Sequence, residues 1–206
     1  MTGINTPGQA LDPRDFVAQG SDASIGVLNP AVGAKNDSER AQSFFTPRII
    51  IGGKKMLNIS ICIITEHKKD FLPLLLLGDE REDMIDKYLE RGTLFALYDG
   101  DLKSICVVTD EGKGTLEIQN IATDERYRKL GYASYLVNHI AERYKTQYDK
   151  ITLGTGDVPS ILAFYNRLGF ITTHRIPDYF TEHYDQPIIE DGILLKDKVY
   201  LERKLK

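Results

Sequence analysis

The sequence has only two cysteines, no long apolar run and no excess of basic residues, and each lack excludes a class of protein. Its most apolar run, Phe71–Leu77, is far shorter than the ~20 residues that a membrane-spanning helix needs. The net charge of −4 and the pI near 5.6 argue against a general nucleic-acid binder. The spacing of cysteine and histidine offers no metal cluster. We therefore expect no membrane, nucleic-acid or metal partner.

The two cysteines, Cys62 and Cys106, both fall inside apolar runs that are typical of strands. No signal peptide precedes them, so the sequence favours reduced thiols in the core of a cytoplasmic protein. With 206 residues, 42% hydrophobic and 27% charged, the chain suits one sizeable globular core.

Residues 1–55 differ in composition from the rest of the chain. They are rich in Gly, Ala, Ser, Asn and Pro and lack helical or strand periodicity, so we expect a poorly ordered extension. Its end, Gly52–Met56, can be encoded by a purine-rich ribosome-binding tract and a start codon. This favours Met56 as the first residue, after a vector-derived or wrongly assigned segment. The alternative is a native extension that docks on the domain through Phe44, Phe45 and residues 49–51.

From residue 56 onward, strand and helix patterns follow each other in one domain, 56–206. Strands are expected at 58–65, 93–98, 102–109, from 114, at 150–154, from 170 and at 198–205. Helices are expected from Asp70 to Leu77, over 80–91, after the turn at 126–131, and from Asp157 to Leu168, with Asp70 and Asp157 as N-caps. The turn Asp99-Gly100-Asp101 is a strong hairpin signal. This order predicts a mixed α/β sheet covered by helices on both sides.

The stretch 114–146 organises the rest of the chain. Its first part alternates like a strand, with Leu116, Ile118 and Asn120 predicted on one face and Glu117, Gln119 and Ile121 on the other. Its last part carries an apolar stripe with helical spacing, from Leu130 to Tyr144. Between them lies a basic turn that ends in Gly131. A turn from strand to helix leaves the first helical amides unpaired, so it is suited to bind an anion such as phosphate.

The spacing in this turn decides between phosphate-binding motifs. It has neither the three glycines of a dinucleotide-binding fingerprint nor the Gly-Lys-Ser/Thr of a P-loop. Its sequence, Arg128-Lys129-Leu130-Gly131-Tyr132-Ala133, resembles the Arg/Gln-x-x-Gly-x-Gly/Ala signature of the GNAT superfamily of N-acetyltransferases. Downstream, Ala163-Phe164-Tyr165-Asn166-Arg167-Leu168-Gly169-Phe170 resembles the family's second signature, Ala-x-x-Tyr-x-x-x-Gly-Phe. The resemblance covers about Leu57 to Lys206 and implies the GNAT α/β fold. The alternative is an ordinary strand–turn–helix with a basic turn.

The resemblance implies a coenzyme site for acetyl-CoA. In the family the central strand separates from its neighbour, and its backbone pairs with the pantetheine arm and the acyl carbonyl. The matching positions are Ile121, Ala122 and Thr123, for which plain strand pairing is the alternative. The pyrophosphate would lie on the backbone amides of Arg128, Lys129, Leu130, Gly131, Tyr132, Ala133 and Ser134.

The resemblance also implies two reacting side chains. Tyr165 matches the family tyrosine that protonates or hydrogen-bonds the leaving thiolate, and an ordinary phenol is protonated at neutral pH. Glu117 stands where some members carry a glutamate that draws the amine proton. The alternatives are a tyrosine that packs in the core and a solvated strand carboxylate. Asp157 stands where many relatives carry an asparagine, which favours helix capping over a coenzyme contact.

The segment 176–192 is polar, aromatic and acidic. Together with Gly154-Thr155-Gly156 it resembles a subgroup of small bacterial GNAT proteins. Because loops carry specificity more often than frameworks do, we predict that Tyr179, Glu182 and Tyr184 line the acceptor pocket. Acidic groups there would favour a protonated amine. The alternative is a solvated loop or a contact in a homodimer.

These patterns together predict an N-acetyltransferase that moves the acetyl group of acetyl-CoA to a primary amine of a small molecule or peptide. Direct transfer in a ternary complex is expected, because no nucleophile is placed for an acyl-enzyme and both cysteines are expected to be buried. The alternative is a non-catalytic acyl-CoA sensor of the same fold. A toxin that acetylates aminoacyl-tRNA is disfavoured by the acidic balance.

Overall fold

The structure is a computed structural model that describes residues 43–45, 50–51, 54–55 and 59–206, the first three ranges by their backbone alone. Its strands are β1 Ser43–Phe45, β2 Ile50–Ile51, β3 Lys54–Lys55, β4 Ile59–Ile64, β5 Thr93–Asp99, β6 Asp101–Asp110, β7 Thr115–Thr123, β8 Lys150–Gly156, β9 Ile171–Ile176, β10 Ile189–Glu190, β11 Ile193–Leu194 and β12 Lys198–Lys204. Its helices are η1 Lys68–Phe71, α2 Leu72–Leu75, α3 Glu82–Leu89, η2 Glu125–Tyr127, α4 Tyr132–Tyr144, α5 Pro159–Arg167 and α6 Tyr179–His183. The expected order of elements in the domain is confirmed.

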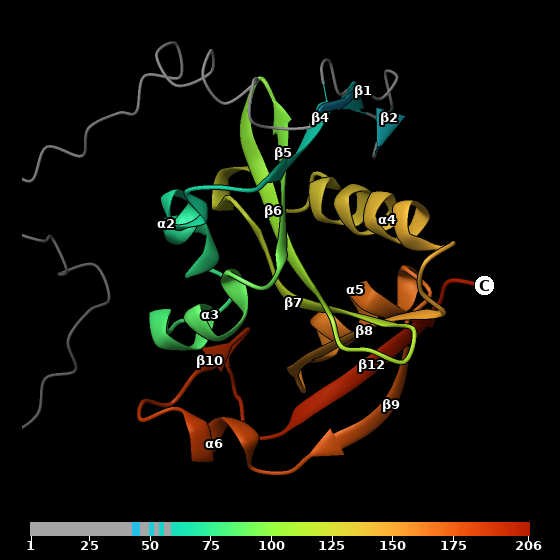
Figure 1. The fold of residues 1–206 in the computed structure, drawn as a ribbon. Coiled ribbons are helices and arrows are strands. Elements are labelled where there is room, and N and C mark those ends of the chain that lie inside the picture. Colours follow the sequence, from blue (N-terminus) through green and yellow to red (C-terminus); the bar gives the residue numbers. More distant parts are fainter. Residues whose placement is uncertain (1–42, 46–49, 52–53, 56–58) are drawn as a thin grey trace, which may run out of the picture.

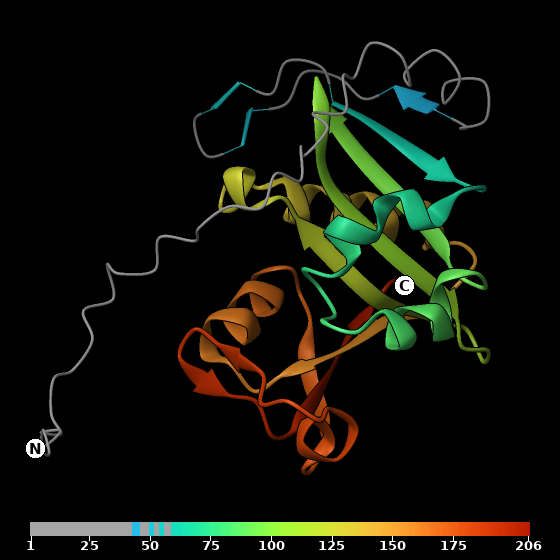
Figure 2. The same cartoon turned by 90° about the vertical axis from the view of Figure 1, so that its left-hand side faces the viewer.

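An eight-stranded sheet in the order β1-β4-β5-β6-β7-β8-β12-β9 forms the centre of the molecule (Figure 1). β7 and β8 run parallel, and the neighbouring pairs on either side of them are antiparallel. Helices α4 and α5 lie on one face of the sheet, and α2 and α3 lie on the other (Figures 1 and 2). The predicted mixed α/β fold with helices on both faces is therefore confirmed.

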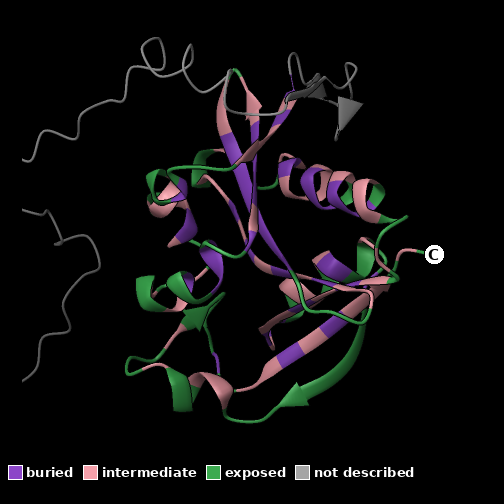
Figure 3. Cartoon of the chain, in the orientation of Figure 1, coloured by how far each residue is buried: buried purple, intermediate pink, exposed green. Residues whose placement is uncertain are grey.

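Each face of the sheet has its own apolar core. On the α4/α5 face, Leu136, Val137 and Ile140 of α4 pack against the central strands, as their helical spacing predicts. On the α2/α3 face, Leu75 and Ile85 pack against β5, β6 and β7. Figure 3 shows this burial along the middle of the sheet, whereas the edge strand β9 is exposed over its whole length. The central strand β7 is thus covered on both sides.

A β-bulge in β7 changes which side chains share a face. Val107 pairs with Asn120 and Val108 pairs with Ile118, so Gln119 is the extra residue. Before the bulge, Ile118 packs in the α4/α5 core; after it, Asn120 lies on the α2/α3 face and Ile121 packs toward α4 and α5. The predicted grouping of Asn120 with Ile118, and of Ile121 with Glu117, is therefore wrong. Strict alternation cannot anticipate an extra residue.

The parallel pair of β7 and β8 is short and opens into a fork. Thr115–Ile118 pairs with Lys150–Leu153, and the register ends there. Beyond it, residues 119–123 of β7 stay paired with β6, and residues 154–156 of β8 stay paired with β12. The β8-facing backbone edge of 119–123 has no strand partner in the described part of the chain. Such an edge can pair with an extended ligand.

Two predicted helix caps are wrong. Asp70 lies inside η1, and α2 begins after Phe71 without a side-chain cap. α5 begins with Pro159 in its first turn after Val158, and Asp157 pairs with Arg175 of β9 instead of capping. In both places proline sets the start of the helix, because its fixed φ suits the first helical turn.

Two further expectations have mixed outcomes. Cys106 is fully buried in β6, but Cys62 on β4 is only half-buried, because it lies nearer the edge of the sheet. Most of the predicted extension 1–55, and Met56 with it, falls outside the described residues, so its extent and origin stay predictions. Of this segment, β1 pairs antiparallel with β4. The side chains predicted to dock are not described.

Candidate active site

The turn between β7 and α4 has a defined backbone shape. Asp124 caps η2 by accepting a hydrogen bond from the backbone amide of Arg126 at 3.0 Å. Lys129 and Gly131 then adopt left-handed conformations, with φ of 62° and 93°. A side chain at the second position would be strained, so the turn needs glycine directly before α4. The predicted glycine is the N-cap of the helix.

The tip of the β5–β6 hairpin holds this turn in place. The Tyr127 hydroxyl group donates to Asp101 Oδ2 at 2.8 Å, and the Tyr132 hydroxyl group donates to Asp99 Oδ2 at 2.9 Å. The Lys103 ammonium group lies 3.5 Å from the centre of the Tyr127 ring and pairs with Asp101. The sequence predicts the hairpin and the turn separately, but no pattern shows that they meet. Their contacts give the turn a shape that exists before any ligand binds.

The first turn of α4 presents unpaired backbone amides. The helical ladder begins with the Tyr135 amide, which donates to the Gly131 carbonyl at 2.9 Å. The amides of residues 132–134 therefore precede the ladder, and no side chain caps this end of the helix. They point outward at the positive end of the helix dipole. This is the arrangement that binds phosphate groups at helix N-termini.

Two exposed cations flank these amides. Arg128 is exposed and lies 3.5 Å from Glu125, while its backbone amide already donates to the Glu125 carbonyl at 3.3 Å. Lys129 is exposed beside it. Arg126, in contrast, is paired with Asp124. Of the predicted series 128–134, the Arg128 amide is thus already paired, and the binding of an anion by the others stays a prediction.

Tyr165 lies on the α4/α5 face. It belongs to α5, is only 7% exposed, and its ring packs against Phe164 and Phe170 at centroid distances of 4.9 and 5.7 Å. Burial raises the pKa of its hydroxyl group, and the nearby Cys106 and Glu190 add to this effect. The phenol is therefore fully protonated at neutral pH. The ring of Tyr165 thus packs in the core, as the alternative for this residue expected. This packing leaves its hydroxyl group able to donate a hydrogen bond.

Glu117 lies on the other face of the sheet, within the paired part of β7 just before the fork. Burial raises the pKa of its carboxyl group, although the positive charge of Lys198 and a hydrogen bond from Tyr200 oppose the shift. A carboxyl group with a raised pKa is a stronger base once it is ionised. Glu117 and Tyr165 thus lie on opposite faces of the sheet near the point where it opens.

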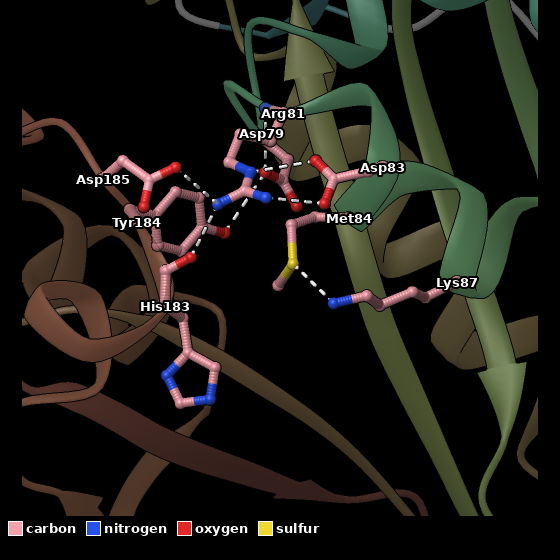
Figure 4. Close-up of polar contacts among 8 residues, drawn as sticks. All are labelled: Asp79, Arg81, Asp83, Met84, Lys87, His183, Tyr184 and Asp185. Carbon is pink, nitrogen blue, oxygen red and sulfur yellow. Dashed lines mark hydrogen bonds and ion pairs between the residues drawn. The ribbon is translucent and has the colours of Figure 1, made fainter.

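A polar–aromatic cluster surrounds Glu117 on this face. Its members are Asp79, Glu117, Tyr179, Tyr184, Lys198 and Tyr200. The Tyr184 hydroxyl group donates to Asp79 Oδ1 at 3.2 Å, and burial raises the pKa of Asp79. Figure 4 shows how Arg81 fixes this contact, because its guanidinium group donates to the His183 carbonyl at 2.9 Å. The segment 177–197 between β9 and β12, the C-terminal arm, is thereby joined to the loop before α3.

Lys198 lies at the centre of the polar–aromatic cluster. Its ammonium group lies 4.5 Å from the Tyr179 ring centre and 5.3 Å from the Tyr200 ring centre. Burial lowers its pKa, and the charges of Glu117 and Asp79 partly oppose this. The cluster therefore combines two carboxyl groups, three tyrosines and one ammonium group.

The structure assembles some of the predicted residues and separates others. Tyr179 and Tyr184 join the polar–aromatic cluster, whereas Glu182 is exposed on α6. Sequence reasoning missed Asp79, Lys198 and Tyr200. No motif marks these three residues, because they come from a loop and a terminal strand that lie more than a hundred positions apart in the chain. The acidic and aromatic composition of 176–192 was the one feature of the sequence that pointed to an acceptor site.

Within the ranges that the structure describes, no group of three or more His, Cys, Asp or Glu side chains is arranged to hold a metal ion. None of the helices described is long and apolar enough to cross a membrane.

Comparison with known proteins shows the family of this chain. The family model described as "Acetyltransferase (GNAT) family" matches residues 63–170, a range that contains both sequence signatures and more than half of the chain. The chain belongs to the GNAT acetyltransferase family. The family that its two signatures resemble is therefore confirmed.

The matches to individual GNAT relatives cover nearly the whole length of each relative. The uncharacterized N-acetyltransferase YvbK of Bacillus subtilis (strain 168) is 37% identical over 150 residues, which make up 71% of this chain and 96% of the relative. A GNAT acetyltransferase from Elizabethkingia anophelis, solved with acetyl-CoA bound, has a TM-score of 0.67 at 30% identity and covers 71% of this chain and 97% of its own. A Bacillus subtilis acetyltransferase in complex with CoA has a TM-score of 0.66 at 36% identity, with 71% and 98% covered. The GNAT fold is thus shared with relatives that bind the coenzyme.

Proposed function

We propose that this protein transfers the acetyl group of acetyl-CoA directly to a primary amine, with both substrates bound at once. The observation that carries the proposal is the fork between β7 and β8. The anion-binding turn lies at the end of β7, and Glu117 and Tyr165 lie on opposite faces of the opened sheet. A donor bound from one side and an acceptor from the other would meet at the fork.

The coenzyme would lie along the open edge of β7 and the first turn of α4. On the open edge of β7, the backbone groups of Ile121 and Thr123 that point away from β6 would receive the pantetheine arm, whereas the Ala122 carbonyl accepts a hydrogen bond from Ser104 Oγ at 2.7 Å. The amides of residues 129–134 would receive the pyrophosphate. Arg128 and Lys129 add charge that phosphate groups attract. When bound, acetyl-CoA supplies an activated acetyl thioester. The two relatives solved with acetyl-CoA or CoA support this assignment.

Glu117 is the proposed base. An amine reacts only after it loses its proton, and a half-buried carboxylate whose pKa is raised accepts a proton better near neutral pH than an exposed carboxylate does. Tyr200 holds this carboxylate by a hydrogen bond. The charge of Lys198 helps to keep it ionised.

Tyr165 is proposed as the hydrogen-bond donor to the leaving sulfur. An ordinary thiol has a pKa near ~8.5, and burial raises the pKa of Tyr165 above its usual ~10. Complete proton transfer from the phenol to the thiolate would therefore be uphill. A hydrogen bond that strengthens as charge develops on the sulfur avoids this cost, in the manner of a preorganised donor.

The polar–aromatic cluster is the proposed acceptor site. Asp79 and Glu117 provide negative charge, and the tyrosine rings provide faces that attract cations. Together they favour an acceptor that arrives as an ammonium ion, carried by a small molecule or a peptide. Tyr179 and Tyr184 keep the acceptor role predicted for them. Glu182 is exposed on α6, so its charge would act only from the edge of this acceptor site.

Direct transfer is preferred over an acyl-enzyme because of the state of the thiols. Cys106 is fully buried, and burial raises its pKa, so its reactive thiolate is disfavoured. Cys62 lies on β4, separated from β7 by β5 and β6 in the order of the sheet. Cys62 is therefore distant from the fork, whereas Cys106 pairs with Ile121 of β7, so burial of its thiol is what disfavours it as a nucleophile. The amine would therefore attack the thioester itself.

The test is acetyl-CoA binding measured by calorimetry on Gly131→Glu and Gly112→Glu. Both glycines have positive φ, so both substitutions add the same strain and charge, but Gly112 lies in a turn with open space around it. We expect Gly131→Glu to abolish binding and Gly112→Glu to retain it. Equal binding by both variants would overturn the coenzyme site. Binding without thiol release over a panel of primary amines would instead favour a non-catalytic sensor.

A further inference from the structure

Lys68, which is buried, and Lys198, which is half-buried, differ in how their ammonium groups are satisfied. Lys68 donates hydrogen bonds to the carbonyls of Leu89, Glu90 and Gly92 at 3.0, 2.9 and 2.7 Å, where it closes the end of α3. The Lys198 ammonium group forms no ion pair and no hydrogen bond with the residues that the structure describes. A partly buried ammonium group without such partners is costly. Lys68 therefore has a structural role that Lys198 lacks.

The side chain of Lys198 lies over the fork. Lys198 begins β12, and its stem folds back across Gly154, where a Cβ atom would lie only 2.2 Å from Lys198 Cε. Gly154 directly follows Leu153, the last residue of β8 that pairs with β7. Glycine at this position thus leaves room for the lysine stem. The amine is held at the place where the sheet opens.

The surroundings of this amine match those proposed for an acceptor. The rings of Tyr179 and Tyr200 hold its ammonium group, and Glu117 and Asp79 are the charges that act on it. The proposed base therefore faces it. Burial also lowers the pKa of Lys198, which increases the fraction of neutral, nucleophilic amine at a given pH.

We propose that Lys198 is itself an acetyl acceptor, so that the protein acetylates this lysine in cis when no external amine is bound. The inference rests on the proposed function. The Lys198 Nζ forms a bond to the acetyl carbonyl carbon, and the thioester carbon–sulfur bond breaks. The amine proton goes to Glu117, and CoA leaves as a thiolate that takes a proton from solvent with Tyr165 hydrogen-bonded to the sulfur. The products are Nε-acetyl-Lys198 and CoA.

The experiment follows the mass of the full chain incubated with acetyl-CoA in a buffer without amines. We expect one acetyl group per chain, located at Lys198 by peptide mapping, at a rate that does not depend on protein concentration. Lys204, exposed at the other end of the same strand, is the matched control and should stay unmodified in the same period. Gly131→Glu should lose the modification, Gly112→Glu should keep it, and Lys198→Arg should gain no acetyl group elsewhere.

The outcomes separate this inference from the function on which it rests. Similar acetylation of Lys204 and Lys198, or a rate that rises with protein concentration, would overturn transfer in cis. Coenzyme binding and thiol release with external amines, but an unmodified Lys198, would overturn the inference and leave the proposed function standing. A chain that does not bind acetyl-CoA in calorimetry would overturn both.

Discussion

The two sides of the proposed reaction are built from the chain in different ways. The coenzyme side comes from one continuous stretch, in which β7, the basic turn and α4 follow each other over residues 115–144. The acceptor side collects Asp79 from a loop, Glu117 from β7, Tyr184 from the C-terminal arm and Lys198 from β12. Local motifs can describe the first side. The second exists only after the chain has folded, so it is the side on which related proteins can diverge.

The largest expected effect tests whether the acceptor side contains the base. Glu117→Gln keeps the shape of the side chain but cannot take a proton, so we expect kcat to fall by about 10²–10⁴-fold. Because burial raises the pKa of Glu117, the wild-type kcat/KM should fall as the pH drops, and this fall should begin at a higher pH than an ordinary glutamate would give. The variant should lack this limb of the pH profile.

The control for this substitution is Glu202→Gln. Glu202 is paired with Lys150 on the neighbouring strand and should change kcat little. If the kcat/KM of Glu117→Gln still fell at low pH as it does in the wild type, the base would be another group.

A smaller loss is expected from Tyr165→Phe, on the face of the sheet opposite the acceptor side. The ring should keep its packing against Phe170, so the Kd for acetyl-CoA should stay the same, whereas the lost hydroxyl group should lower kcat by about 10²–10³-fold. Stopped-flow thiol release with calorimetry on the same sample would measure both. Tyr148→Phe, at a half-buried tyrosine next to Tyr144, is the control for removing a phenol. Equal kcat in the two variants would reduce Tyr165 to a packing residue.

A third substitution separates acceptor binding from chemistry. Asp79→Asn removes one negative charge from the polar–aromatic cluster, so the KM for a cationic amine should rise by roughly tenfold, which corresponds to about 1.4 kcal/mol. The Kd for acetyl-CoA should not change. Asp185→Asn, at a carboxylate that is 96% exposed, gives the same charge change outside the cluster and should leave the KM within about twofold. A shared increase in both variants would indicate long-range attraction rather than a binding site.

The coenzyme side and the acceptor side also differ in how much of each could be predicted from the sequence. The turn at 128–133 and its glycine could be predicted, because an uncapped helix start after a strand has a local signature, and the structure places Gly131 at the N-cap. The faces of β7 could be predicted only as far as Ile118, because the bulge at Gln119 leaves no sign in the alternation of side chains. The contact of Tyr184 with Asp79 joins residues that lie far apart in the chain. Such a contact depends on how the end of α6 lies against the loop before α3, which no local pattern encodes.

The smallest expected effect concerns stability and compares Lys198→Met with Lys68→Met. The lowered pKa of Lys198 means that the cost of enclosing its ammonium group exceeds the attraction of Glu117 and Asp79. A lysine with a depressed folded-state pKa destabilises the fold below that pKa, and this cost disappears as the pH rises toward 10.5, the ordinary lysine value. At pH 7, Lys198→Met should therefore raise Tm by about 2–4 °C, equal to about 1 kcal/mol in a domain of this size.

Lys68→Met should shift Tm in the opposite direction, because it leaves three carbonyls at the end of α3 without their donor. Thermal unfolding of both variants at pH 7 and near pH 10 would measure the difference. The gain for Lys198→Met should shrink at the higher pH. A loss of stability in both variants would mean that Lys198 supports the fold as Lys68 does. The contrast between the two lysines would then no longer support a role of the Lys198 ammonium group in the reaction.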